Sequence, residues 1–495
     1  MLYLRPYAQC PVFLEHLREK IVNILIICTN RAVSPMPVMP IGACVVAEAA
    51  ERAGHSVALL DLMFAADPLR AIEAALSRSI YDLIGLSVRN IDNNDMHGTV
   101  FYIDDLAPLI DAVRRNTDAP IVLGGASLTV MPEEILRTVG ADCAVLGDGE
   151  ATFPRLLERM MRHEPWEDLP GIAFLKDGTF RANPSPTVVT NVCAIPAYHR
   201  WVDLNAYRLQ LSTVPVQTKI GCRFHCVYCT YRKIEGSACR LSDPESVADA
   251  VSRLAASGHR DIEFVDSVFN DPQDHAVSVC EALIRSGVRA RFQSLELNPS
   301  HFDDGLLTVM ERAGFVGIGL TVESAADPVL RGLRKGFTAR EVHGAAETVR
   351  SHRLPCVWIF MLGGPGETRE TVRETLRFAE KKIRPRDAAF FNVGIRVYPG
   401  TELESIARHQ GVLTIPPQDM LAPVFYVSPD VDAAWIRAQV KNSMNSHMNF
   451  MSADSFSFPY LPLIHRMGYR LGVRPPLWPY TRYIRRGLRF AGMDV

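Results

Sequence analysis

The chain lacks two features that often dictate where a protein works: a long apolar run and an excess of one charge. No stretch of about 18 apolar residues occurs, so no membrane-spanning helix is predicted. The 53 Lys and Arg residues nearly balance the 55 Asp and Glu residues, so no global field recruits nucleic acid or a membrane surface. The first 20 residues lack the apolar core and cleavage site of a secretory signal. We therefore expect a cytoplasmic protein.

Motifs of the commonest nucleotide-binding sites are also missing. No GxGxxG follows the first predicted strand, IVNILIIC, and no GK[ST] occurs, so neither a dinucleotide site nor a P-loop is predicted. The loop after that strand, TNRAVSPMPVMPIG, contains no histidine. A ligand of this region must therefore be bound without a dinucleotide motif, a P-loop or a histidine from this loop.

Cysteine is scarce, but three of the eleven cysteines fall within one short segment, CRFHCVYC. They are Cys222, Cys226 and Cys229. In a reducing compartment clustered cysteines indicate metal binding or catalysis. Structural zinc takes four ligands and a redox dithiol takes two, whereas three thiolates on a [4Fe–4S] cluster leave one iron open. Zinc with His225 as the fourth ligand is the alternative.

The length of 495 residues exceeds the size of a single core and predicts two or three domains. Over residues 1–160, five short apolar runs alternate with helical patterns, which predicts a doubly wound, Rossmann-like parallel sheet. Ligands of such sheets bind outside the carboxyl ends of the strands. Polar or small residues follow these runs and are the candidate contacts: Ser87, Arg89, Gly124, Gly125, Gly147, Gly149 and Glu150.

The next two segments are a connector and a second α/β domain. Residues 161–205 are rich in proline, and Asp177-Gly178 between two apolar runs predicts a β-hairpin. Over residues 206–410 six further strand-and-helix units follow, too few for a closed eight-stranded barrel, so we expect an open, partial (β/α)6 barrel. The cysteine segment follows the first of these strands, where active groups of such barrels lie.

The CxxxCxxC spacing with Tyr228 inside it resembles the cluster loop of the radical S-adenosylmethionine (SAM) superfamily. The resemblance implies a [4Fe–4S] cluster whose open iron chelates SAM, and an external one-electron reductant of the flavodoxin or ferredoxin type. It also implies SAM contacts from loops after the later strands. These candidates are Asp266, Ser267, Glu323, Ser324, Gly364 in LGGPGET and Val397 in VYPGT.

The N-terminal region resembles the cobalamin-binding domain attached to many radical SAM enzymes, in Ser87, Gly124-Gly125 and the GDGE segment that ends at Glu150. Cobalamin domains that ligate cobalt from below carry DxHxxG after the first strand, and this sequence does not. The resemblance therefore implies a lower axial position that holds water or nothing, with Arg89 beneath the cobalt. An ordinary solvated arginine is the alternative for Arg89.

Together the two modules resemble the cobalamin-dependent radical SAM enzymes. That group implies a methyltransferase that moves a methyl group from SAM, via methylcobalamin, to an unactivated carbon or phosphorus of a small natural-product or lipid precursor. A rearrangement, cyclisation or oxidation with the same cofactors is the first alternative. A non-catalytic cobalamin or redox sensor is the second, and LGGPGET together with an open iron counts against it.

The C-terminal extension, residues 411–495, carries seven arginines between Arg466 and Arg489, interleaved with aromatic residues and with no acid among them. The favoured interpretation is a capping subdomain whose arginines pair with acids elsewhere. Peripheral contact with an anionic membrane or an acidic substrate is the alternative. Nucleic acid is not expected as a partner, because the basic residues are confined to this tail.

Overall fold

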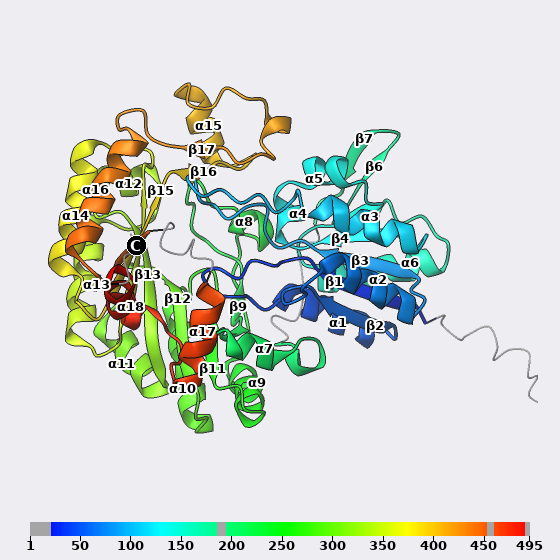
Figure 1. Cartoon of the computed structure of the whole chain (residues 1–495), viewed down its shortest axis with the longest axis horizontal. Coiled ribbons are helices and arrows are strands. Elements are labelled where there is room, and N and C mark those ends of the chain that lie inside the picture. Colours follow the sequence, from blue (N-terminus) through cyan, green and yellow to red (C-terminus); the bar gives the residue numbers. More distant parts are fainter. Residues whose placement is uncertain (1–20, 186–194, 453–459, 491–495) are drawn as a thin grey trace, which may run out of the picture.

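The structure, a computed structural model, describes residues 21–185, 195–452 and 460–490. The first 20 residues, on which the expectation about a secretory signal rests, lie outside this range. The described chain forms two α/β domains, each built on a seven-stranded sheet, which lie side by side in Figure 1. No helix in these three segments is long and apolar enough to cross a membrane.

The first sheet has the strand order β2-β1-β3-β4-β5-β6-β7, and β1 to β5 run parallel. These five strands are β1 (Asn23–Cys28), β2 (Ser56–Asp61), β3 (Leu83–Ser87), β4 (Ile121–Gly124) and β5 (Cys143–Val145). The connecting helices are α1 (Ile41–Arg52), α2 (Pro68–Arg78), α3 (Leu106–Asn116), α4 (Ala126–Val130), α5 (Pro132–Val139) and α6 (Gly149–Met161). The predicted doubly wound sheet is confirmed.

The predicted hairpin forms at Asp177-Gly178, where both residues have positive φ, 50° and 74°, as a tight two-residue turn requires. Its strands are β6 (Ile172–Lys176) and β7 (Thr179–Ala182). The hairpin does not stand apart as a connector, because β6 pairs antiparallel with β5 and extends the first sheet. The edge of β5 would otherwise leave backbone N–H and C=O groups unpaired, and β6 supplies their hydrogen-bond partners.

The second sheet is parallel throughout, with the order β18-β15-β14-β13-β12-β11-β8. Its strands are β8 (Val214–Val216), β11 (Asp261–Phe264), β12 (Arg291–Leu297), β13 (Phe315–Glu323), β14 (Cys356–Leu362), β15 (Ala388–Val393) and β18 (Phe450–Ser452). Sequential neighbours without closure give the open barrel that the sequence predicts. The seventh strand, β18, comes from the C-terminal extension and was not predicted.

Helices follow nearly every strand of the second sheet and cover its outer face (Figure 1). They are α9 (Pro244–Ala256), α10 (Gln273–Ser286), α11 (Asp304–Ala313), α12 (Asp327–Gly332), α13 (Ala339–Ser351) and α14 (Arg369–Lys382). Smaller elements are α7 (Leu204–Leu209), α8 (Tyr231–Ile234), α15 (Glu402–His409) and the pairs β9 (Lys219–Ile220) with β10 (Arg240–Leu241) and β16 (Ile395–Arg396) with β17 (Phe425–Tyr426). The extension adds α16 (Ala433–Ser446), α17 (Leu461–Arg470) and α18 (Thr481–Phe490).

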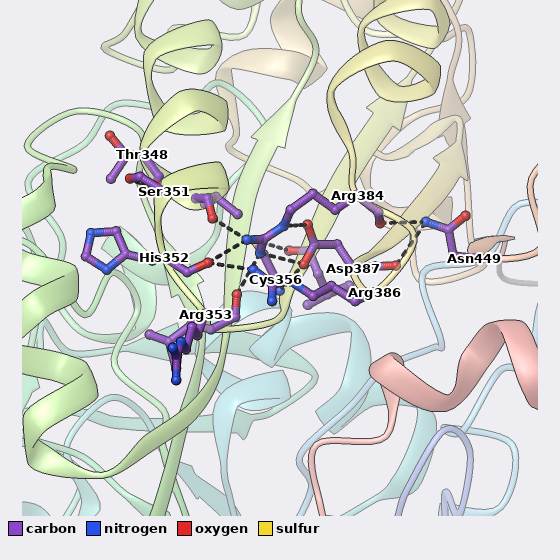
Figure 2. A network of polar contacts seen from close by, with 12 residues as sticks. Thr348, Ser351, His352, Arg353, Cys356, Arg384, Arg386, Asp387 and Asn449 are labelled. Atoms are coloured by element: carbon purple, nitrogen blue, oxygen red, sulfur yellow. Dashed lines mark hydrogen bonds and ion pairs between the residues drawn. The ribbon is translucent and has the colours of Figure 1, made fainter.

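A polar network lies at the amino ends of β14 and β15 (Figure 2). The Arg384 guanidinium pairs with Asp387 at 2.6 Å and donates to the carbonyls of His352 and Leu354, both at 2.7 Å. Asp387 in turn accepts the first backbone N–H of β14, from Cys356, at 2.9 Å. One arginine thereby satisfies backbone groups that the end of α13 and the turn into β14 leave unpaired.

Replacing Asn449 by Ala should destabilise this end of the barrel by about 1–3 kcal/mol, because two buried carbonyls lose their donor. The Asn449 side chain donates to the carbonyls of Arg384 and Asp387 at 3.2 and 3.0 Å. Chemical denaturation of the purified protein measures the change. Asn442→Ala, an exposed amide on α16, is the matched control and should stay within about 0.5 kcal/mol. Equal effects of the two substitutions would contradict a role for Asn449 in the network.

Candidate functional site

A cavity of about 390 Å³ lies between the two domains. The first domain contributes residues from the carboxyl ends of β1, β3, β4 and β5 and from the first turns of α1. The second contributes residues around the cysteine loop, among them Ile220, Tyr231 and Glu235. The cavity therefore occupies the edge of the parallel sheet where ligands of such folds bind, and it faces the second domain there.

All seven candidate residues of the first domain lie on the wall of this cavity. A Cβ placed on Gly124 meets nothing within 4 Å, so this position opens into the cavity. Gly125 has φ +100°, and a Cβ there would lie 2.5 Å from the Val88 carbonyl oxygen. Only glycine fits that approach of two backbone segments. The two glycines leave room for a large flat ligand against the ends of β3 and β4.

Arg89 is the cation of this wall. Its side chain is exposed at the cavity and donates to Asn90 Oδ1 at 3.2 Å, a neutral partner. The positive charge is therefore not neutralised by a neighbouring carboxylate among the described residues. The loop after β1 supplies Asn30 to the cavity and no histidine. Arg89 thus lies where the sequence analysis expects a charge near a bound cobalt, and its role stays a prediction.

Two ion pairs, one buried and one partly buried, join the domains beside the cavity. Arg396 of β16 pairs with Asp92, in the loop after β3, at 2.8 Å, and the two side chains are 2% and 0% exposed. Arg240 of β10 pairs with Asp148, in the GDGE segment, at 2.5 Å. Because the partners come from different domains, these pairs hold the loops that carry Arg89 and Gly149 against the cysteine loop.

The cysteine loop runs between β9 and α8, and its backbone is held on several sides. Gly221 has φ +102°, and a Cβ there would collide with the Ala238 carbonyl, so glycine is required. The Val227 N–H donates to the Leu333 carbonyl at 3.1 Å, and the Val227 carbonyl accepts from Leu403 at 2.9 Å. The loop is therefore preorganised by the segments after β13 and before α15.

The three thiols sit in a dry environment. Burial raises the pKa of Cys226 and raises that of Cys229 to about 12. Their thiolates therefore need a metal to form at neutral pH. Within the described residues no three His, Cys, Asp or Glu side chains are grouped so that they could hold a single metal ion. A cubane does not need such a group, because each thiolate binds a separate iron. His225 is exposed and its Nδ1 lies 2.7 Å from Arg232 Nη1, so it is not arranged as a zinc ligand.

Behind the loop lies a buried triad of Tyr228, Glu323 and Lys335. The Tyr228 hydroxyl donates to Glu323 Oε1 at 2.6 Å, and Lys335 Nζ donates to the same oxygen at 2.8 Å. Lys335 and Glu323 are 6% and 7% exposed. Burial opposes the charge of the ammonium, yet the Glu323 carboxylate and the neighbouring thiols raise the pKa of Lys335. The second oxygen of Glu323, Oε2, is buried without a partner, so it is available to a ligand with a hydroxyl or ammonium group.

Two other candidates, Asp266 and Ser267, are engaged in local contacts. The Asp266 carboxylate accepts from the Thr218 hydroxyl and N–H, both at 2.7 Å, and from the Lys219 N–H at 3.0 Å. It therefore braces the strand that leads into the cysteine loop. Ser267 donates to the Gly221 carbonyl at 3.3 Å, which places it beside that loop.

The structure does not bring Ser324 to the cysteine loop. Its hydroxyl lies 3.0 Å from that of Thr375 on α14 and accepts from the Ala326 N–H at 3.1 Å. Strand β13 ends at Glu323, whose φ is +57°. The chain therefore turns at this residue, and Ser324 contacts the helix layer instead.

Gly364 and Val397 lie in the expected segments after β14 and β16. A Cβ on Gly364 would meet the Leu333 side chain at 3.0 Å, and Val397 is 1% exposed in the core. The neighbouring Glu367 accepts from the Gly363 N–H at 3.1 Å, and burial raises its pKa to about 7. These segments form a close-packed wall next to α12, and contact with SAM stays a prediction for both residues.

Sequence reasoning missed several residues of the site. Lys335 sits in RGLRKGF, a basic stretch that is typical of a solvated turn, and nothing in the local pattern distinguishes it. Tyr231 and Glu235 follow the cysteine loop and line the cavity. Glu296 on β12 is a further buried acid, and burial together with Glu323 raises its pKa to about 7. For Tyr231 and Glu235 the available signal was an aromatic residue and an acid shortly after the cysteine loop.

Two families match the chain in the order of the two domains. Residues 27–157 match the B12 binding domain and residues 216–379 match the radical SAM superfamily. The described geometry fits the groups that these families hold. A glycine-lined cavity suits a corrin, three unpaired thiols suit a cubane with an open iron, and the unpartnered Glu323 Oε2 suits SAM.

Characterised and solved relatives share this arrangement. The tryptophan 2-C-methyltransferase of Streptomyces laurentii is 24% identical over 77% of this chain and 74% of its own length. The hopanoid C-3 methylase of Methylococcus capsulatus is 26% identical over 73% and 67%. An uncharacterised methyltransferase of Pyrococcus horikoshii is 28% identical over 58% of this chain, which spans 63% of that relative.

The structure of the radical SAM methyltransferase TsrM from Kitasatospora setae, with cobalamin and a [4Fe–4S] cluster bound, superimposes with a TM-score of 0.82. The two share 22% identity, and the match covers 95% of this chain and all of TsrM. At this identity the likeness establishes the fold. With a B12-binding domain and a radical SAM domain in one chain, and methyltransferases among its relatives, the protein belongs to the cobalamin-dependent radical SAM enzymes.

Proposed function

We propose that the protein transfers a methyl group from SAM to an unactivated carbon or phosphorus of a small natural-product or lipid precursor. The observation that carries the proposal is the single cavity lined both by the ends of β1, β3 and β4 and by Tyr231 and Glu235 beside the cysteine loop. Methyl transfer from SAM via cobalamin to a substrate needs both cofactors to face one cavity. Relatives that act on tryptophan and on a hopanoid support the choice of reaction and leave the substrate open.

When bound, the cluster with SAM supplies one-electron cleavage of a carbon–sulfur bond, and cobalamin supplies a carrier for the methyl group. The chain's part is to hold and orient them. Cys222, Cys226 and Cys229 would hold three of the four cluster irons, while Glu323 Oε2 would offer an acceptor to the ribose or amino group of SAM. Tyr228 and Lys335 fix the orientation of that carboxylate through its other oxygen.

The first domain orients the second group. Gly124 and Gly125 let a corrin approach the ends of β3 and β4, and Ser87 presents a hydroxyl at the same edge. Arg89 places a positive charge there without a carboxylate partner. This charge would lie beside a bound corrin and would oppose further positive charge on it. The paired contacts of Asp92 and Asp148 keep these loops facing the second domain.

The proposal includes an external one-electron reductant of flavodoxin or ferredoxin type and a cytoplasmic setting. All nine cysteines in the described part of the chain are unpaired thiols, which supports a reducing compartment. Peripheral membrane contact through the C-terminal extension is developed below.

The test needs no substrate. Protein purified without oxygen from cobalamin-supplied cells is reduced and given SAM with a labelled methyl group. Label recovered on the corrin by mass spectrometry is the expected result, and deoxyadenosine, whose formation needs the cluster, should be lost in Cys226→Ala. Corrin that stays unlabelled while deoxyadenosine forms would overturn methyl transfer.

That second outcome would favour the alternative reaction class of rearrangement, cyclisation or oxidation. The anaerobic magnesium-protoporphyrin IX monomethyl ester cyclase of Rubrivivax gelatinosus is 25% identical over 53% of this chain and 49% of its own length. Cyclases are thus among the relatives, which is the observation in favour of this alternative. Labelled substrate products, once a substrate is known, decide between the two.

A further inference from the structure

The end of the described chain, from Tyr460 to Phe490, forms a surface of unusual composition. This segment contains seven arginines and no Asp or Glu. It folds into α17 and α18, joined by a turn that anchors Trp478 in the barrel, where the side chain is 9% exposed. We call the exposed residues of α17 and α18 the tail face. The reaction proposed above assigns it no role.

The tail face carries an apolar stripe that has no packing partner among the described residues. Leu463, Met467 and Leu471 recur every four residues along α17 and its end, and they are 56%, 54% and 82% exposed. Residues at this spacing lie on one side of a helix. The opposite side packs on α7, where Gly468 meets Leu211. On α18 three more large apolar residues are exposed, namely Tyr483, Ile484 and Phe490.

Arg466 and Arg470 lie on α17 together with this stripe, and Arg486 lies on α18. Arg466, Arg470 and Arg486 are exposed, and in the described segments no salt bridge joins them to an acid. Some exposed arginines elsewhere do form such pairs, as Arg285 does with Glu245 at 2.6 Å and Arg334 with Glu402 at 2.7 Å. The expectation that the tail arginines pair with acids elsewhere is therefore not met by these three.

Arg485, the buried arginine of α18, has a structural role. Its guanidinium donates to backbone carbonyls at the end of α16 and before β18, among them His447 at 3.1 Å and Phe450. This contact fixes α18 on the barrel, so the tail face is presented on a rigid support.

We propose that the tail face docks on an anionic lipid bilayer. An exposed apolar stripe with arginines on the same helix suits the boundary between headgroups and acyl chains, where both sets of side chains are satisfied at once. Nucleic acid would engage the arginines and leave Leu463, Met467 and Leu471 in water. The acid-free composition complements a negative membrane surface, which attracts each nearby Arg.

The position of the tail face connects it to the cavity. Figure 1 shows α17 next to α7, and the two helices are in contact. Arg208 of α7 lies over the Tyr469 ring of α17 at 5.8 Å. Tyr207, on the same short helix, lines the cavity and donates to Asp61 at 2.7 Å. α7 thus links the docking surface to the cavity wall, an arrangement that suits a substrate held in a membrane.

The proposal is tested with the full-length holoenzyme and vesicles of phosphatidylcholine with or without phosphatidylglycerol. Co-sedimentation should occur with the anionic vesicles, weaken as salt shortens the Debye length, and be lost on neutral vesicles. The double variant Arg466→Glu/Arg470→Glu should lower the partition constant by about tenfold or more, because two attractive charges become repulsive. Leu471→Asp should also lower the partition constant, because it places a negative charge in the apolar stripe.

Controls keep the charge and the exposure constant. Arg78→Glu/Arg115→Glu makes the same charge change on exposed residues of α2 and α3, and Ile80→Asp replaces an apolar residue that is 89% exposed. Both should bind vesicles as the unaltered protein does, and corrin content with thermal unfolding checks folding. An equal loss of vesicle binding in the controls would overturn the proposal. So would binding to neutral vesicles only, or a lack of vesicle binding together with self-association that Leu471→Asp abolishes. The result does not depend on methyl transfer.

Discussion

Replacing Cys226 by Ala is expected to abolish turnover while the protein still binds cobalamin. Each thiolate of the loop holds one iron of a cubane, so loss of one leaves two ligands for four irons. The loop lies between β9 and α8, and the corrin-facing glycines lie in the other domain. Iron and sulfide content should fall and deoxyadenosine should no longer form, while the absorbance of the corrin should remain.

Two matched variants make this prediction specific. Cys280→Ala removes a thiol that is 0% exposed within α10, and it should leave iron content unchanged. His225→Ala removes the candidate fourth ligand of a zinc site and should also leave iron unchanged, since the imidazole is exposed and contacts Arg232. Full activity of Cys226→Ala, or zinc in place of iron, would contradict the cluster assignment.

The cluster loop and the parallel sheets could be predicted from the sequence because their signals are local. Three cysteines at fixed spacing define a site within eight residues, and buried parallel strands have near-continuous apolar runs. The triad behind the loop could not be predicted in the same way. Lys335 meets Glu323 and Tyr228 only after β13 and α12 fold, and a lysine in a basic turn carries no local sign of burial.

Two further differences have physical reasons. Glu323 and Ser324 are adjacent in the sequence, but the chain turns at Glu323, where φ is +57°. Glu323 therefore meets Tyr228 and Lys335, while Ser324 meets Thr375. Strand β18 has three residues, Phe450 to Ser452, which is too short for a periodic pattern. It becomes a strand because β15 offers it an edge, with Phe390 opposite Met451.

Lys335→Met is expected to destabilise the second domain by about 3–5 kcal/mol, because it leaves the buried Glu323 carboxylate without its counter-charge. The ammonium is the only cation within bonding distance of that carboxylate in the described structure, at 2.8 Å. Tyr228 remains as a neutral donor, which cannot replace a charge. Denaturant unfolding of the holoenzyme measures the loss, and Lys381→Met, at an exposed lysine of α14, should change it by less than about 0.5 kcal/mol.

The double variant Glu323→Gln/Lys335→Met separates charge from packing. If Lys335 acts by neutralising Glu323, a neutral amide in place of the carboxylate should restore most of the lost stability, since no uncompensated charge is then buried. Lys335 also lies close enough to Cys226 and Cys229 for their charges to interact with it. Its removal alone should therefore make the midpoint potential of the cluster more negative, because a nearby positive charge favours the electron-rich state. The double variant also loses the opposing charge of Glu323, so its potential should shift less. A double variant as unstable as Lys335→Met, or an unchanged potential in Lys335→Met, would show that the lysine acts through packing alone.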